Sequence, residues 1–128
     1  MLGDKLSDFA LVLAGGAIGS ALRYMVTLLP HGGNTTFPLK TLFVNALGCF
    51  LIGLIAIYIQ HHIHQQLIAL FLITGFLGGF TTFSTFSYET AVLLHDGYIR
   101  TAILNILIST GLGLISVAAG MLAGMYIR

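Results

Sequence analysis

The chain has 128 residues, of which 57% are hydrophobic and only 7% are charged. Soluble domains carry about 25% charged residues, so this composition excludes a soluble globular protein. The net charge of +1 argues against nucleic acid as a partner, because nucleic-acid-binding domains are strongly basic. The single cysteine, Cys49, allows no disulfide within the chain, and we expect it to be a small buried residue.

Four apolar stretches are each long enough to cross a bilayer, which takes about 20 residues. They predict membrane spans over about residues 9–29, 37–60, 67–94 and 99–126, separated by short polar loops. The polar segment Met1–Asp8 is not expected to be a cleavable signal peptide. The sequence therefore predicts an all-α, multi-pass protein of a cell membrane, with one four-helix domain over residues 1–128.

The positive charges are divided almost evenly between the two sides of the membrane. Four crossings place Lys5 and Arg128 on one side, and Lys40 and Arg100 on the other, with Arg23 close by. Orientation normally follows an excess of Lys and Arg on the cytoplasmic side. The balance indicates either a misplaced span or a chain that inserts both ways and pairs antiparallel with itself. Four helices are also too few to enclose a pore, which favours a homodimer.

The third stretch contains an unusual segment, GFLGGFTTFSTFSYE, over residues 75–89. Each glycine inside a helix costs about 1 kcal/mol relative to alanine. Gly75, Gly78 and Gly79, followed by two β-branched threonines, therefore predict a break over residues 75–82. In lipid, unpaired backbone is tolerated only where protein buries it or where it lines a water-filled path. This segment therefore predicts a functional site.

Other polar residues lie inside the apolar stretches, and each has two interpretations. Arg23 either snorkels to the membrane surface or attracts anions at a pore mouth. Asn45 either bonds a neighbouring helix or donates to a permeant anion. Glu89 is either a functional acid or a carboxyl that lies close to the membrane end or is bonded to nearby hydroxyls. Asn105 and Ser109, spaced i and i+4, form either a polar track or a link between helices.

The remaining motifs are weak. His61, His62 and His64 lie close in sequence but without acidic or cysteine partners, which favours a solvated loop over a metal site. The two GxxxG patterns, Gly15–Gly19 and Gly120–Gly124, are typical of close helix contacts. No combination of residues suits catalysis by a nucleophile or by paired carboxylates, so we do not expect an enzyme.

Taken together, these motifs resemble the Fluc (CrcB) family of fluoride ion channels. The resemblance is carried in order by GGAIGSALRY, FPLKTLFVNALGCFLIG, GFLGGFTTFSTFSYE and NILISTGLG, and it covers essentially the whole chain. It implies an antiparallel, dual-topology homodimer with two pores in a bacterial cell membrane. It also implies passive export of fluoride, which relieves fluoride toxicity.

The resemblance implies roles for individual residues. Phe83 and Phe86 match the paired pore phenylalanines, and Asn45 matches the pore asparagine. The other positions that it places along the pore or its vestibule are Arg23, Thr41, Ser84, Thr85, Glu89 and Ser109. Gly78 and Thr81 match the positions whose backbone carbonyls hold a structural sodium ion, which is not transported, at the dimer axis.

Four positions depart from the family pattern, and none removes a pore or sodium position. Ser20 stands where alanine is expected, Phe80 replaces an aliphatic residue, and Asn105 stands where tyrosine is also common. Lys40 replaces a small or apolar residue and should add positive charge to the vestibule.

The chemistry of the segment suits fluoride. This small, strongly hydrated ion needs directed donors, which Asn45 and the hydroxyls supply. Aromatic rings carry a positive edge, so an anion should meet Phe83 and Phe86, spaced i and i+3 on one face, at their edges.

Two other functions remain to be weighed. A proton-coupled, four-helix multidrug exporter is expected to carry an acid in its first span and tryptophan near its substrate. Here the first span has no acid after Asp8, and the chain has no tryptophan. The second is a helper subunit of a larger membrane complex, against which the dense polar content of the third span argues.

Overall fold

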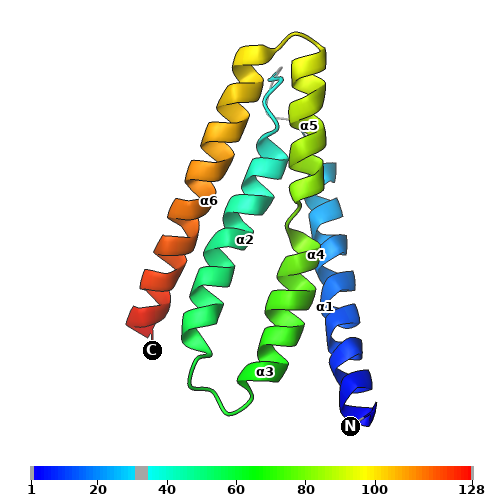
Figure 1. Cartoon of the computed structure of the whole chain (residues 1–128), viewed down its shortest axis with the longest axis vertical. Helices are drawn as coiled ribbons and strands as arrows, with labels where there is room; N and C mark the ends of the chain where they lie inside the picture. The colour runs from blue at the N-terminus through cyan, green and yellow to red at the C-terminus, as the bar shows by residue number, and fades with distance from the viewer. Residues whose placement is uncertain (1, 31–34, 128) are drawn as a thin grey trace.

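The computed structural model describes residues 2–30 and 35–127, and these residues are helical apart from short connections. The elements in chain order are α1 (Leu2–Leu28), α2 (Leu39–Tyr58), α3 (Gln65–Ile68), the π-helix η1 (Ala69–Leu77), α4 (Gly78–Phe80), α5 (Phe83–His95) and α6 (Ile99–Ile127). The elements from α3 to α5 follow one another along a single interrupted path (Figure 1).

Four helical paths are long and apolar enough to cross a membrane: Lys5–Leu28, Leu39–Tyr58, Gln65–His95 and Ile99–Ile127. They run side by side, with both ends of the chain and the α2–α3 loop at one end of the bundle (Figure 1). Four helices lie at the four expected spans, with boundaries that shift by no more than two residues, except that the first helix already begins at Leu2. The chain is a multi-pass membrane protein.

The turn between α5 and α6 has a clear local cause. Gly97 adopts a positive φ of 83°, which a side chain would disfavour. Its N–H donates to Leu94 O at 3.2 Å, and the next N–H, of Tyr98, donates to Leu93 O at 2.8 Å. This pair of bonds closes the C-terminus of α5 in a Schellman motif and lets α6 begin at once.

Glycines allow close contact between helices at two places. One is between α1 and the third span, at η1 and α4, and the other is between α2 and α6. A Cβ added to Gly19 would collide with the carbonyl oxygen of Phe76, and one added to Gly120 with that of Phe50. A Cβ at Gly124 would lie 2.8 Å from Leu54 O. Both GxxxG patterns therefore lie at contacts between helix backbones, as the sequence predicts.

The helix break is shorter than the sequence indicates. Only Thr81 and Thr82 leave the helix, whereas the expected break covered residues 75–82. The three glycines are helical. A Cβ on Gly75 would lie 2.8 Å from Val12 O, and one on Gly79 would lie 3.1 Å from Gly16 Cα. These two glycines thus allow α1 to approach, and they do not break the helix.

Candidate functional site

The break is held open by Asn45 on α2. Thr81 and Thr82 are extended, with φ/ψ of −78°/159° and −151°/115°. The N–H of Thr82 donates to Asn45 Oδ1 at 2.8 Å, and Asn45 Nδ2 donates to Thr82 O at 3.0 Å. One amide side chain therefore pairs with both backbone polar groups of Thr82. The N–H would otherwise lack an acceptor, whereas the carbonyl, as that of the N-cap residue, also accepts the first bond of α5.

Thr82 is also the N-cap of α5. Its Oγ1 accepts the N–H of Thr85 at 3.1 Å, which satisfies one of the free donors at the start of the helix. The same hydroxyl donates to Thr85 Oγ1 at 3.0 Å and lies 3.2 Å from the exposed Ser84 Oγ. The sequence analysis uses Thr82 only to mark the break and does not predict its capping role, although a threonine directly before Phe83 with Thr85 at the third helical position is a capping signal.

Several backbone carbonyls lose their usual partners at the break, and those of Gly78 and Thr81 are among them. In an uninterrupted helix, the N–H of Thr82 would bond Gly78 O and the N–H of Thr85 would bond Thr81 O. Both N–H groups instead donate to side-chain oxygens, of Asn45 and of Thr82. The two residues predicted to bind a cation through their carbonyls are thus among those whose carbonyls have lost their helical donors.

A groove of about 380 Å³ lies beside the break, and we call it the break groove. It joins side chains from α2, the interrupted third path and α6. Its lining residues are Asn45, Gly48, Cys49, Ile52, Ile73, Leu77, Gly78, Thr81, Thr82, Phe83, Phe86, Ser109 and Thr110. It brings together six of the predicted site residues: Asn45, Gly78, Thr81, Phe83, Phe86 and Ser109.

Two aromatic rings stand at this groove. The ring centroids of Phe83 and Phe86 are 5.6 Å apart and the ring planes are tilted by 42°. Phe83 is 79% exposed in the single chain, which is unusual for a pore-lining or core aromatic unless another surface covers it. The two rings share one face of α5, as their spacing predicts.

Cys49 also lines the groove and is half-buried, so the expectation of a buried thiol is only partly correct. The reason is its orientation. It faces the break groove, which Gly48 also lines while it packs against the side chain of Thr81.

Arg23 connects α1 to the end of α4. Its Nε donates to Gly79 O at 3.0 Å. A cation at the C-terminal end of a helix interacts favourably with the helix dipole. One nitrogen of the guanidinium is thus held by the protein, and its two interpretations, a snorkelling anchor and an attractor of anions, both stay open. Arg23 lines a crevice of about 40 Å³ that also includes Lys40, Thr41, Thr82 and Thr85.

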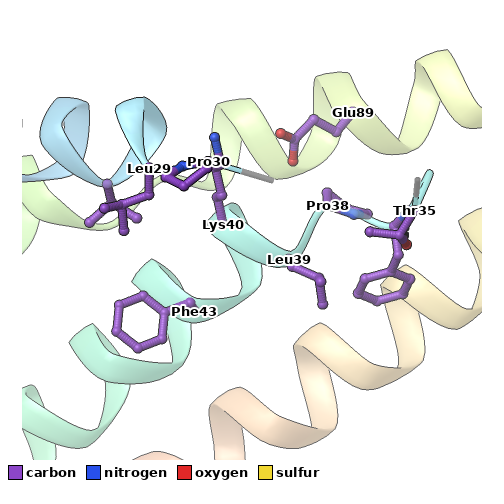
Figure 2. Close-up of a pocket in the computed structure, with 10 residues that line it drawn as sticks. Leu29, Pro30, Thr35, Pro38, Leu39, Lys40, Phe43 and Glu89 are labelled. Carbon is purple, nitrogen blue, oxygen red and sulfur yellow. Dashed lines mark hydrogen bonds between the residues drawn. The ribbon is translucent and has the colours of Figure 1, made fainter. Parts of the chain in front are cut away.

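Glu89 lies at the end of the bundle near the start of α2. Its Oε1 accepts the hydroxyl of Thr41 at 2.9 Å, whereas its buried Oε2 has no partner among the described residues. Glu89 and Lys40 line one pocket of about 260 Å³, which we call the mouth pocket (Figure 2). Its other lining residues are Val26, Leu29, Pro30, Thr35, Phe37, Pro38, Leu39 and Phe43.

A buried polar chain connects α6 to α5. Asn105 is 1% exposed, and its Nδ2 donates to Thr90 Oγ1 at 2.9 Å. Thr90 in turn donates to Phe86 O at 2.7 Å, and Ser109 Oγ donates to Asn105 Oδ1 at 3.2 Å. The predicted pair of Asn105 and Ser109 is therefore bonded internally and links the helices. Thr90, which the sequence analysis missed, is its partner.

The loop histidines lie away from these features. His61, His62 and His64 are exposed between α2 and α3, and His62 Nδ1 accepts the N–H of His64 at 3.1 Å. His31 lies outside the described residues.

The fold and the groove define a small four-helix membrane protein with an interrupted helix. This is the arrangement by which ion-transporting proteins place backbone groups at membrane depth. A profile of the family described as "CrcB-like protein, Camphor Resistance (CrcB)" matches residues 10–121. The chain therefore belongs to the CrcB family, as the resemblance of its motifs implies.

Curated relatives support the same membership. The chain is 47% identical over 116 residues to a protein of Paracoccus denitrificans (strain Pd 1222), covering 91% of this chain and 93% of the relative. It is 44% identical over 118 residues to a protein of Rhizobium meliloti (strain 1021), covering 91% and 94%. Both relatives are named "Fluoride-specific ion channel FluC". The family is thus one of ion channels and is not enzymatic, which confirms that part of the sequence analysis.

Proposed function

We propose that this chain is a fluoride-selective channel that lets fluoride leave the cell passively and so relieves fluoride toxicity. The observation that carries the proposal is the break groove, where Phe83 and Phe86 lie beside the amide of Asn45 and the hydroxyl of Ser109. The names of the relatives support fluoride as the ion.

The groove suits a small anion that must give up its water. Amide groups donate hydrogen bonds, and tilted aromatic rings present positive edges. The Ser109 hydroxyl donates its one proton to Asn105 Oδ1, and it would have to turn to donate to an ion. Asn45 uses one N–H of its Nδ2 group on Thr82 O, which leaves the second available for an ion. The sequence analysis also places Thr41, Thr85 and Glu89 along the route, and these lie in the crevice and the mouth pocket toward one end of the bundle.

The conducting unit in this proposal is an antiparallel homodimer. The balanced Lys and Arg residues favour insertion in both orientations. The break groove is open along the side of the single chain, and Phe83 is largely exposed. A second copy that covers this face would close the groove into a route screened from lipid.

A structural sodium ion at the dimer axis belongs to the same proposal. Gly78 and Thr81 line the groove, and their carbonyls have lost their helical donors, so these oxygens fit a hard cation. Two copies would supply four such oxygens. When bound, the ion would supply positive charge that offsets part of the cost of holding anions nearby.

Purified protein in liposomes tests the function directly. We expect rapid release of fluoride, measured with a fluoride electrode in the presence of a potassium ionophore, and far slower release of chloride. Equal release of both ions, or release at the rate of empty liposomes, would overturn the proposal. A multidrug exporter predicts instead substrate movement driven by a proton gradient, with no passive fluoride release.

A separate measurement tests the sodium ion. Replacing sodium by a large organic cation should lower the melting temperature of the protein in detergent and reduce fluoride release. Unchanged stability and release after this replacement would count against the site at Gly78 and Thr81.

A further inference from the structure

The mouth pocket contains two opposite charges. Among the described residues that line it, Lys40 on α2 and Glu89 on α5 are the ones that carry charge. In Figure 2 the carboxylate of Glu89 extends toward the side of the pocket on which the amine of Lys40 lies. The remainder of the lining is apolar except for Thr35, so few polar side chains screen the two charges from each other.

The two side chains are each held by a different group. Lys40 Nζ donates to Thr27 O in the last turn of α1 at 2.6 Å. Glu89 accepts the Thr41 hydroxyl through Oε1 and keeps Oε2 without a partner among the described residues. The structure records no ion pair within 4 Å between these two described side chains. They therefore interact through the pocket, at a distance, and not by contact.

We propose that the positive charge of Lys40 offsets the negative charge of Glu89 at the mouth of the anion route, so that Lys40 sets how readily an anion enters. This inference rests on the proposed function. A carboxylate at the mouth of an anion route repels the ion that approaches it. An ammonium group on the same pocket reverses or cancels that field, and such fields change entry rates by about tenfold or more.

Lys40 also makes a structural contact, whose effect must be separated from the proposed effect of its charge. Its bond to Thr27 O closes the end of α1 and ties it to α2. A structural role depends on that hydrogen bond and is indifferent to the charge of Glu89. A role through charge depends on Glu89 and on ionic strength. The two roles therefore predict different results for the same variants.

A double-mutant cycle on initial fluoride release from liposomes separates the two roles. In a chain that keeps Glu89, we expect Lys40→Met to lower fluoride release by about three- to tenfold. In the Glu89→Gln background, the same change should lower release by less than about twofold, because the charge to be offset is gone. Lys40→Arg is the matched control and should retain release. An equal factor for Lys40→Met in both backgrounds would overturn the proposal.

Ionic strength provides a second test. It does not use the Glu89→Gln variant, so it remains informative even if that variant passes no fluoride. Charges at the mouth are screened over about 30 Å at 0.01 M salt and about 3 Å at 1 M. The deficit of Lys40→Met should therefore shrink when an impermeant salt is raised across this range. A deficit that stays constant would overturn the charge role. Wild-type protein without fluoride release would overturn the proposed function itself, whereas normal wild-type release with a constant deficit overturns only the role of Lys40.

Discussion

Asn45 and Thr82 form a reciprocal pair of hydrogen bonds across the interrupted helix, at 2.8 Å from Thr82 N to Oδ1 and 3.0 Å from Nδ2 to Thr82 O. An asparagine side chain has one acceptor and one donor group, so it can pair with the N–H and the C=O of one extended residue, as a neighbouring β-strand does. This pair fixes where the third path breaks, and it engages the N–H that Gly78 O would otherwise accept.

Asn45→Asp should damage the channel without removing side-chain volume. The carboxylate still accepts the N–H of Thr82, but it cannot donate to Thr82 O, and it places negative charge on the anion route. The loss of this hydrogen bond costs about 0.5–1.5 kcal/mol. We expect fluoride release to fall by at least about tenfold while the dimer persists, measured by liposome release and size-exclusion chromatography. Wild-type release from this variant would refute the assignment of Asn45.

Phe83→Ile and Phe86→Ile should each strongly reduce fluoride release. Isoleucine keeps most of the apolar surface but has no positive ring edge to offer an anion. We expect a reduction of about tenfold or more in each variant. Phe9→Ile is a matched control, because Phe9 is exposed on α1 and does not line the break groove. If all three variants release fluoride equally, the rings play no part in conduction.

Gly19→Ala should destabilise the fold. The added methyl group would meet the carbonyl oxygen of Phe76, and backbone atoms cannot move aside as a flexible side chain does. Overpacking of this kind costs about 1–3 kcal/mol. Gly111→Ala is the matched control, because nothing lies within 4 Å of its added Cβ, and it should be neutral or stabilising. Thermal unfolding in detergent measures the difference, and equal melting temperatures would contradict the close packing of α1 on η1.

Asn105→Leu should also destabilise the protein, through unpaired polar groups. Asn105 is almost fully buried and bonds both Thr90 and Ser109. Leucine fills a similar volume but leaves these partners unsatisfied, at about 1–3 kcal/mol. Ile106→Leu, at the exposed neighbouring position, should change the unfolding free energy little. If Asn105→Leu unfolds at the same temperature as the wild-type protein, the buried hydrogen bonds of Asn105 do not contribute to stability.

The sequence predicts the four spans and the break because both depend on strong local signals. Long apolar stretches have one stable solution in a membrane, and β-branched Thr81 and Thr82 mark the break. The extent of the break was not predictable from glycine content. Gly75 and Gly79 stay helical because α1 packs against them, and this contact joins residues about 60 positions apart.

The same limit applies to the polar residues. The spacing of Asn105 and Ser109 predicts a shared face, but the partner on α5, Thr90, depends on how the helices pack. Arg23 gives no sequence signal that it will bond Gly79 O, since that carbonyl becomes available only at the break. Types of residue and helical faces are thus readable from sequence, whereas partners across helices require the fold.

That fluoride passes through the break groove is tested most directly at Cys49, which lines the groove and is the one cysteine of the chain. The protein is treated with a bulky methanethiosulfonate reagent in detergent, checked by mass spectrometry and reconstituted. We expect modification to stop fluoride release from wild-type liposomes and to leave Cys49→Ala unaffected by the same treatment. Full modification of Cys49 with undiminished fluoride release would contradict a route through this groove.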